Sequence, residues 1–144
     1  RIKPNISRKI VICDRFIDST SAYQVHGKGV NKNLVDYIHK YILRDIKPDL
    51  TFVLTVNISK ALKRVKNRRK KNRYDKFSKN FYSEVQKAFI KIAQKNKKRY
   101  IILDNSRDSR DVEKIIYERC LNFLKKWTSA LMATEAVGEY LIMI

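Results

Sequence analysis

The residues best suited to chemistry follow a short apolar run near the start of the chain. Residues 10–13, I-V-I-C, predict a strand buried on both faces, as parallel strands are. Asp14 and Arg15 come directly after it, and open α/β sheets bind ligands at the carboxyl ends of their strands. Residues 19–24 then hold five hydrogen-bonding side chains in six positions, and a helical turn would point several of them at one small polar guest. We therefore expect a binding site here.

A second chemically active group is a dense cationic run. Residues 63–73, K-R-V-K-N-R-R-K-K-N-R, hold eight basic side chains in eleven positions. Like charges at this density repel one another unless an anion is present, so the run predicts a flap that closes over phosphate. For Lys66, Lys70 and Lys71 a solvated basic face is the preferred interpretation.

Residues 12–24, I-C-D-R-F-I-D-S-T-S-A-Y-Q, resemble the signature of the thymidylate kinase family at every position. The resemblance spans about residues 2–127. It implies an α/β fold of three layers, with a parallel sheet flanked by helices, like that of P-loop NTPases and nucleoside monophosphate kinases. It also implies transfer of the γ-phosphoryl group of ATP to dTMP with Mg²⁺, for dTTP biosynthesis, in a homodimer.

The resemblance assigns Arg15 to the phosphate of the acceptor nucleotide, close to the transferring group, as a catalytic residue. It assigns Asp14 to a water of the ATP-bound Mg²⁺. Arginine suits the first role because its planar fork meets two oxygens at once and stays charged. One carboxylate suits the second because Mg²⁺ keeps several of its waters. In the simpler alternative, Asp14 and Arg15 pair with each other or cap the next helix.

The same resemblance assigns the base and sugar of dTMP to the polar residues that follow. Thr20 would read the carbonyls and N–H of thymine. Gln24 would contact the base or the phosphate, or alternatively have a purely structural place. Tyr23 would lie against the sugar and exclude a 2′-hydroxyl. Ser19 would bond to the backbone and shape the turn.

The cationic run resembles the lid of these kinases, at about residues 64–76. The arginines that would reach over ATP are Arg64, Arg68 and Arg73, with Arg68 and Arg73 also catalytic. Two residues depart from the family pattern, Arg69 in place of a small residue and Asn72 in place of an acid. These departures predict a lid that closes less tightly.

No G-x-x-x-x-G-K-[ST] phosphate loop occurs in the sequence, which has only three glycines. We therefore expect a C-terminal two-thirds of a thymidylate kinase that is inactive by itself. Residues 1–127 would form the kinase-like domain. The tail, residues 128–144, would be a short extra helix or foreign sequence, because it lacks the lysines and arginines of the preceding chain.

Periodicity predicts further strands at 50–56 and 100–104, both parallel to the first. Helices are expected at 16–24, where glycines then open a mobile loop, and at about 33–42, capped by Asn33 with one buried face. Others are expected from 59, over 78–96 and over 109–127. The aromatic stripe of the 78–96 helix is interpreted as core or dimer surface rather than as a ligand site.

The formal net charge of +19 leaves a nucleic-acid-binding module open as an alternative to nucleotide binding. A related nucleoside monophosphate kinase is a further alternative. The two cysteines, Cys13 and Cys120, indicate no disulfide framework, and no apolar stretch reaches the roughly 20 residues of a membrane helix. A cytoplasmic protein without membrane contact is expected.

Overall fold

The computed structural model describes residues 2–6, 9–67, 77–106, 109–132 and 140–143. Its helices are α1 (Lys3–Ile6), α2 (Ile17–Thr20), the π-helix η1 (Ser21–His26), α3 (Lys32–Leu43), α4 (Ile58–Lys66), α5 (Lys79–Gln94) and α6 (Ser109–Met132). Its strands are β1 (Ile10–Cys13), β2 (Leu50–Thr55), β3 (Tyr100–Asp104) and β4 (Tyr140–Met143). Among these residues, no helix is both long and apolar enough to cross a bilayer.

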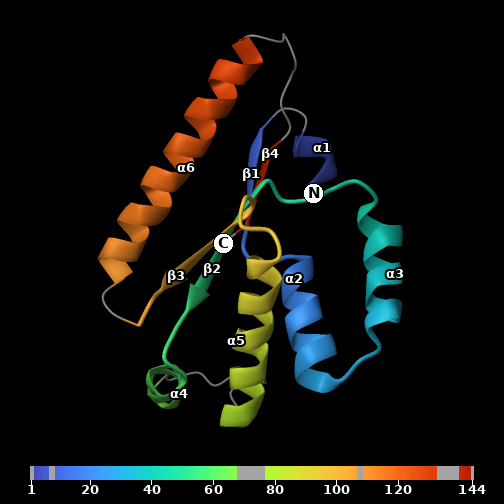
Figure 1. The fold of residues 1–144 in the computed structure, drawn as a ribbon, viewed down its shortest axis with the longest axis vertical. Coiled ribbons are helices and arrows are strands. Elements are labelled where there is room, and N and C mark those ends of the chain that lie inside the picture. The colour runs from blue at the N-terminus through green and yellow to red at the C-terminus, as the bar shows by residue number, and fades with distance from the viewer. Residues whose placement is uncertain (1, 7–8, 68–76, 107–108, 133–139, 144) are drawn as a thin grey trace.

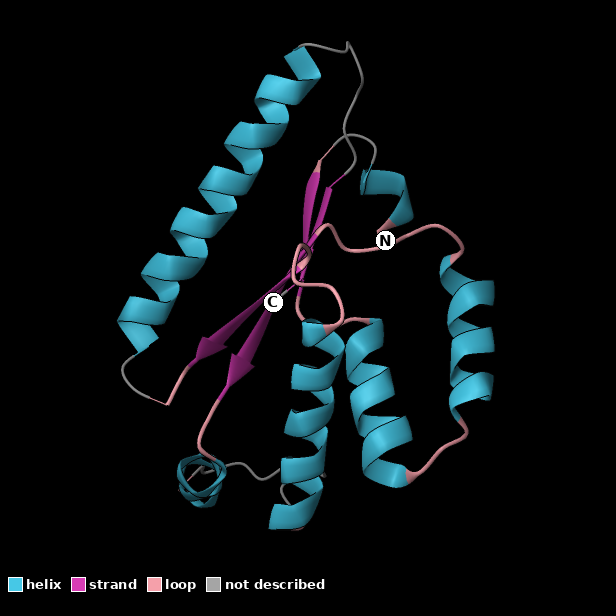
Figure 2. Cartoon of the chain, viewed as in Figure 1, coloured by secondary structure: helices cyan, strands magenta, loops and turns pink. Residues whose placement is uncertain are grey.

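The strands form one parallel sheet in the order β1-β4-β2-β3. Helix α6 lies on one face of the sheet, and α2, η1 and α5 lie on the other, with α3 outside them (Figure 1). Figure 2 shows the strands as a twisted layer between helices. The predicted three-layer α/β class is confirmed.

Alternation along β2 supplies the core on both faces of the sheet. Leu50 and Phe52 are buried in a cluster that includes residues of α6, whereas Val53 is buried with residues of α5 and β3. Because β2 is apolar on both sides, it forms the centre of the fold, as expected of a parallel strand.

The C-terminal segment contributes an interior strand rather than a separate helix. Helix α6 runs past residue 127 to Met132, and β4 then lies between β1 and β2. It pairs with β1 from Ile10↔Tyr140 to Cys13↔Met143 and with β2 at Leu50↔Ile142. Ile142 is 1% exposed, so the apolar character of this segment is used in the core.

Strand β1 differs from the prediction that both of its faces are buried. Ile10 is 47% exposed and Ile12 is 65% exposed. The physical reason is that a groove of about 500 Å³, lined by Ile12 and by residues of α6, lies between β1 and that helix. The isoleucines of β1 therefore face open space on that side.

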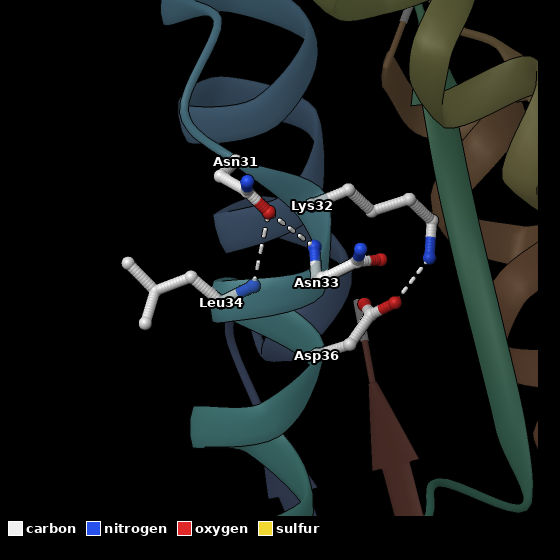
Figure 3. A network of polar contacts seen from close by, with 5 residues as sticks. All are labelled: Asn31, Lys32, Asn33, Leu34 and Asp36. Atoms are coloured by element: carbon white, nitrogen blue, oxygen red, sulfur yellow. Dashed lines mark hydrogen bonds and ion pairs between the residues drawn. The ribbon is translucent and has the colours of Figure 1, made fainter.

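Helix α3 also differs from the prediction, at its start and on its apolar face. Its cap is Asn31 rather than Asn33, because the Asn31 side-chain oxygen accepts from the amides of Asn33 at 2.8 Å and Leu34 at 3.3 Å (Figure 3). Val35 is buried, but Tyr41 is 77% exposed. Helix α3 packs mainly against η1 and turns most of its apolar side chains outward.

The two glycines after η1 have different roles, since Gly27 packs against α5 and Gly29 ends the helix. A Cβ at Gly27 would lie 2.6 Å from the Phe81 ring and 3.0 Å from Val85, so Gly27 permits the close approach of η1 to α5. The helix ends at Gly29, whose φ of 72° favours glycine. The helical segment is thus longer than expected.

Candidate functional site

A cavity of about 370 Å³ lies between α2, η1, β2, α4 and α5. Four of the predicted site residues line it: Asp14, Arg15, Ser19 and Tyr23. Most of the remaining wall is apolar and comes from β2, α4 and α5. Apolar walls with a few convergent polar groups are typical of sites for small molecules.

Arg15 and Tyr23 lie on the same side of the sheet and face each other. The guanidinium carbon of Arg15 is 5.3 Å from the centroid of the Tyr23 ring, which is a cation–π distance. Arg15 has a φ of 66°, in the left-handed region, and its carbonyl accepts from the Cys13 thiol at 3.4 Å. This backbone geometry sets the direction in which the arginine leaves the strand.

Packing against α5 holds the Tyr23 ring in place. Its centroid lies 6.0 Å from that of Phe81 and 6.2 Å from that of Phe89, both on α5. The turn that carries Tyr23 is a π-helix, a rare conformation that is frequent at functional sites. The adjacent Ala22 is fully buried against α5.

The other two residues predicted for the base lie elsewhere. Thr20 is exposed and Gln24 is half-buried, and neither lines the cavity. Their roles in reading thymine stay predictions.

Two polar residues of α5, Tyr82 and Gln86, line the cavity although the sequence did not indicate them. The Gln86 side-chain oxygen accepts from the Val56 amide at 3.0 Å, just beyond β2. Their spacing of four places them on one face of α5, next to the apolar stripe, and this was the available signal. Within that stripe Val85 is buried, as predicted for core, yet Val85 and Phe89 also line the cavity.

Of the predicted lid, about residues 64–76, the structure describes only residues 64–67, at the end of α4. Ala61 and Leu62 line the cavity, and Arg64 follows on the exposed side of the same helix. Arg68 and Arg73, with the rest of the predicted lid through residue 76, lie outside the described residues. Their roles stay predictions.

Asp14 is an exposed carboxylate on the cavity, beside Arg15. Within the described part of the chain, no group of three His, Cys, Asp or Glu side chains could hold a metal ion directly. The single carboxylate of Asp14 fits a Mg²⁺ ion that keeps its waters and takes its remaining ligands from phosphates. It does not fit a site in which protein oxygens supply all the ligands.

The family model that matches the chain is described as thymidylate kinase and covers residues 1–116. A thymidylate kinase of Ehrlichia chaffeensis is 39% identical over 115 residues, and one of Wolbachia pipientis wMel is 49% identical over 88 residues. The first match covers 79% of this chain and 54% of the relative, and the second covers 60% and 42%. The chain therefore spans about half the length of these curated relatives.

A solved structure gives the same result. The crystal structure of thymidylate kinase from Ehrlichia chaffeensis has a TM-score of 0.60 and 32% sequence identity to the chain. The match covers 84% of this chain and 55% of that one. Sequence model, relatives and structure agree, and the chain belongs to the thymidylate kinase family.

Proposed function

We propose that the chain is part of an enzyme that transfers the γ-phosphoryl group of ATP to dTMP, giving dTDP. The observation that carries this proposal is the placement of Arg15 and Tyr23 on one cavity at the end of β1. A guanidinium at this position can bind two phosphate oxygens, and a ring beside it can pack against a deoxyribose.

The acceptor nucleotide would lie with its phosphate at Arg15 and its sugar at Tyr23. Ser19 lies on α2 between the two and would hold the turn. Thr20 and Gln24 would read the base, although neither lines the cavity in this structure. Tyr23 packs on Phe81 and Phe89, and a ring held in this way would exclude a 2′-hydroxyl from a sugar bound beside it.

ATP and Mg²⁺ would bind on the same side of the sheet. Asp14 would accept from a Mg²⁺-bound water, and Arg64, Arg68 and Arg73 would reach the transferring phosphate. The ion would supply positive charge at the phosphate oxygens, and the three arginines would add to that charge. An arginine that acts only in the transition state is worth about 10³-fold in rate. We propose that this chain has no turnover by itself, because it holds no glycine-rich phosphate loop.

The test is calorimetric titration of the chain with dTMP, in the native sequence and in Arg15→Gln. Loss of a charge-assisted contact to phosphate should weaken binding by roughly 1.5–3 kcal/mol, which is ten- to a hundredfold in Kd. Arg119→Gln is the matched control, because Arg119 is an exposed arginine of α6. Equal affinities of the two variants would remove Arg15 from the phosphate site.

The net charge of +19 supports a second candidate, binding of nucleic acid through the cationic run. Filter binding to single-stranded DNA at two salt concentrations separates the two functions. Non-specific binding to a polyanion weakens steeply as salt rises, whereas a nucleotide pocket that reads a base is far less sensitive. We favour the nucleotide, since a defined cavity holds the signature residues.

We propose a homodimer that uses the exposed apolar face of α3. This face carries Leu34, Tyr37, Ile38, Tyr41 and Ile42. A two-fold contact buries the same surface on both copies, so one apolar face suffices. Sedimentation equilibrium should show Tyr41→Lys as a monomer and Tyr117→Lys, an exposed tyrosine of α6, unchanged from the native chain. Identical association of all three proteins would exclude this face.

We also propose a cytoplasmic location. The two cysteines of the chain, Cys13 and Cys120, are both free thiols, as expected in a reducing compartment. Oxidation of purified protein should give no intramolecular disulfide by mass spectrometry.

A further inference from the structure

A buried carboxylate, that of Asp18, is next in sequence to Ser19, which lines the cavity. Asp18 is 7% exposed, and one of its oxygens, Oδ2, accepts two hydrogen bonds. Arg99 Nη2 donates at 2.9 Å and the Tyr100 hydroxyl donates at 2.8 Å. These partners lie 81 and 82 residues further along the chain, so the contact joins α2 to the start of β3. We call Asp18, Arg99 and Tyr100 the Asp18 anchor.

The Asp18 anchor is itself fixed to β2. Arg99 Nε donates to the Thr51 hydroxyl at 3.2 Å, and the Thr51 amide donates to the Arg99 carbonyl at 2.9 Å. Thr51 is fully buried. The guanidinium carbon of Arg99 also lies 4.5 Å from the centroid of the Tyr100 ring. Arg99 is thus held by a strand, a ring and a carboxylate, which leaves it little freedom to follow Asp18 if α2 moves.

The Tyr100 hydroxyl, the second donor to Asp18, keeps its proton. Burial, and after it the negative charge of Asp18, raise the pKa of the Tyr100 hydroxyl well above its ordinary value. Tyr100 therefore stays a neutral donor at neutral pH. Hydrogen bonds to a buried carboxylate are stronger than those between neutral groups.

The position of Asp18 in the chain connects the Asp18 anchor to the site. Asp18 immediately precedes Ser19 and follows Arg15 by three residues. The N-cap of α2, Phe16, makes no side-chain hydrogen bond to the helix, and the strand before it is an edge strand with one face exposed. Neither feature fixes the first turn of α2 strongly. Asp18 supplies the directed contact that does so.

We infer that Asp18 is a positioning residue, which sets the first turn of α2 against β2 and β3. Through that turn it places Arg15 and Ser19 on the cavity. The ligand named in this inference, dTMP, rests on the proposed function, whereas the placement of the turn rests on the hydrogen bonds alone.

Amide hydrogen exchange tests the placement without any ligand, in Asp18→Asn and in Tyr100→Phe. Amides of residues 16–24 should exchange about tenfold faster than in the native chain, with those of β2 changed much less. Asp36→Asn, an exposed carboxylate of α3, should leave both regions unchanged. A purely structural role would speed exchange of β2 and of residues 16–24 by the same factor. That result, or unchanged exchange in residues 16–24, would overturn the inference.

Calorimetry with dTMP tests the consequence for the site. Asp18→Asn should raise the Kd about tenfold while the stoichiometry stays that of the native chain. In an Arg15→Gln background the same substitution should change the Kd less than twofold, because the group it positions is gone. A lowered stoichiometry with an unchanged Kd would show a folding defect and overturn the inference. If the native chain binds no dTMP but residues 16–24 loosen in Asp18→Asn, the proposed function fails and the positioning role stands.

Discussion

The backbone of Arg15 gives a prediction in which glycine stabilises the protein relative to alanine. A residue with a Cβ pays about 1–2 kcal/mol for the left-handed conformation, and Arg15 adopts it with a φ of 66°. Glycine pays no such cost but loses about 0.5–1 kcal/mol more than alanine in chain entropy on folding. Arg15→Gly should therefore be more stable than Arg15→Ala by about 0.5–1 kcal/mol.

Comparing these two variants isolates the backbone, because both lack the guanidinium and its contact with Tyr23. Urea unfolding followed by circular dichroism gives the two free energies of unfolding. The control pair is Lys91→Gly and Lys91→Ala, at an exposed position inside α5, where alanine should be more stable by about 1 kcal/mol. The sign must thus reverse between the two sites. If Arg15→Ala equals or exceeds Arg15→Gly in stability, Arg15 does not hold a left-handed conformation and its direction is not set by the backbone.

Three further predictions concern stability. Burial raises the pKa of Tyr100 above its ordinary value of 10, so its contribution to the free energy of unfolding is full below pH 10. That contribution is lost as pH rises further, at up to about 1.4 kcal/mol per pH unit. Urea unfolding between pH 9 and 11 should show this loss, and Tyr100→Phe should abolish it. Ile142→Ala should cost about 2–4 kcal/mol and Ile12→Ala less than about 1 kcal/mol, because only the first is buried; equal costs would mean that β4 is outside the core. Gly27→Ala should cost about 1–3 kcal/mol through its clash with Phe81, measured by thermal unfolding, and an unchanged Tm would contradict that packing.

Sequence patterns within one segment were sufficient to predict those elements of the fold that depend on neighbouring residues. Strands 50–55 and 100–104 and the helix of α5 follow from runs and periods that are visible within each segment. The same is true of Arg15 and Tyr23, since the eight-residue spacing between them is bridged by one helical segment. Residues whose positions are set by a continuous stretch of chain could therefore be placed on a common site in advance.

Contacts between segments that are far apart in the sequence could not be predicted in this way. The order of strands in a parallel sheet depends on contacts among distant segments, so nothing local indicated that β4 would lie between β1 and β2. Asp18 lacked a visible partner, because Arg99 and Tyr100 lie more than 80 residues away. The periodicity of α3 predicted one buried face, and this was wrong, because whether an apolar face is covered depends on what packs against it.

Arg15, in its left-handed conformation, lies only three residues before Asp18. This proximity gives a last prediction. A strained residue persists only where surrounding structure holds it, because an unconstrained chain would relax to the right-handed conformation. Three residues after Arg15, Asp18 is hydrogen-bonded to Arg99 and Tyr100 and cannot follow such a relaxation.

Asp18→Asn weakens that restraint, so position 15 should relax and the advantage of glycine there should shrink. The stability difference between Arg15→Gly and Arg15→Ala, measured by urea unfolding, should fall from about 0.5–1 kcal/mol to near zero in the Asp18→Asn background. In the Asp36→Asn background the difference should be unchanged, because that carboxylate lies on the exposed side of α3. If glycine keeps its full advantage in Asp18→Asn, the turn that follows β1 holds the strain alone. The Asp18 anchor then positions α2 without determining the conformation of Arg15.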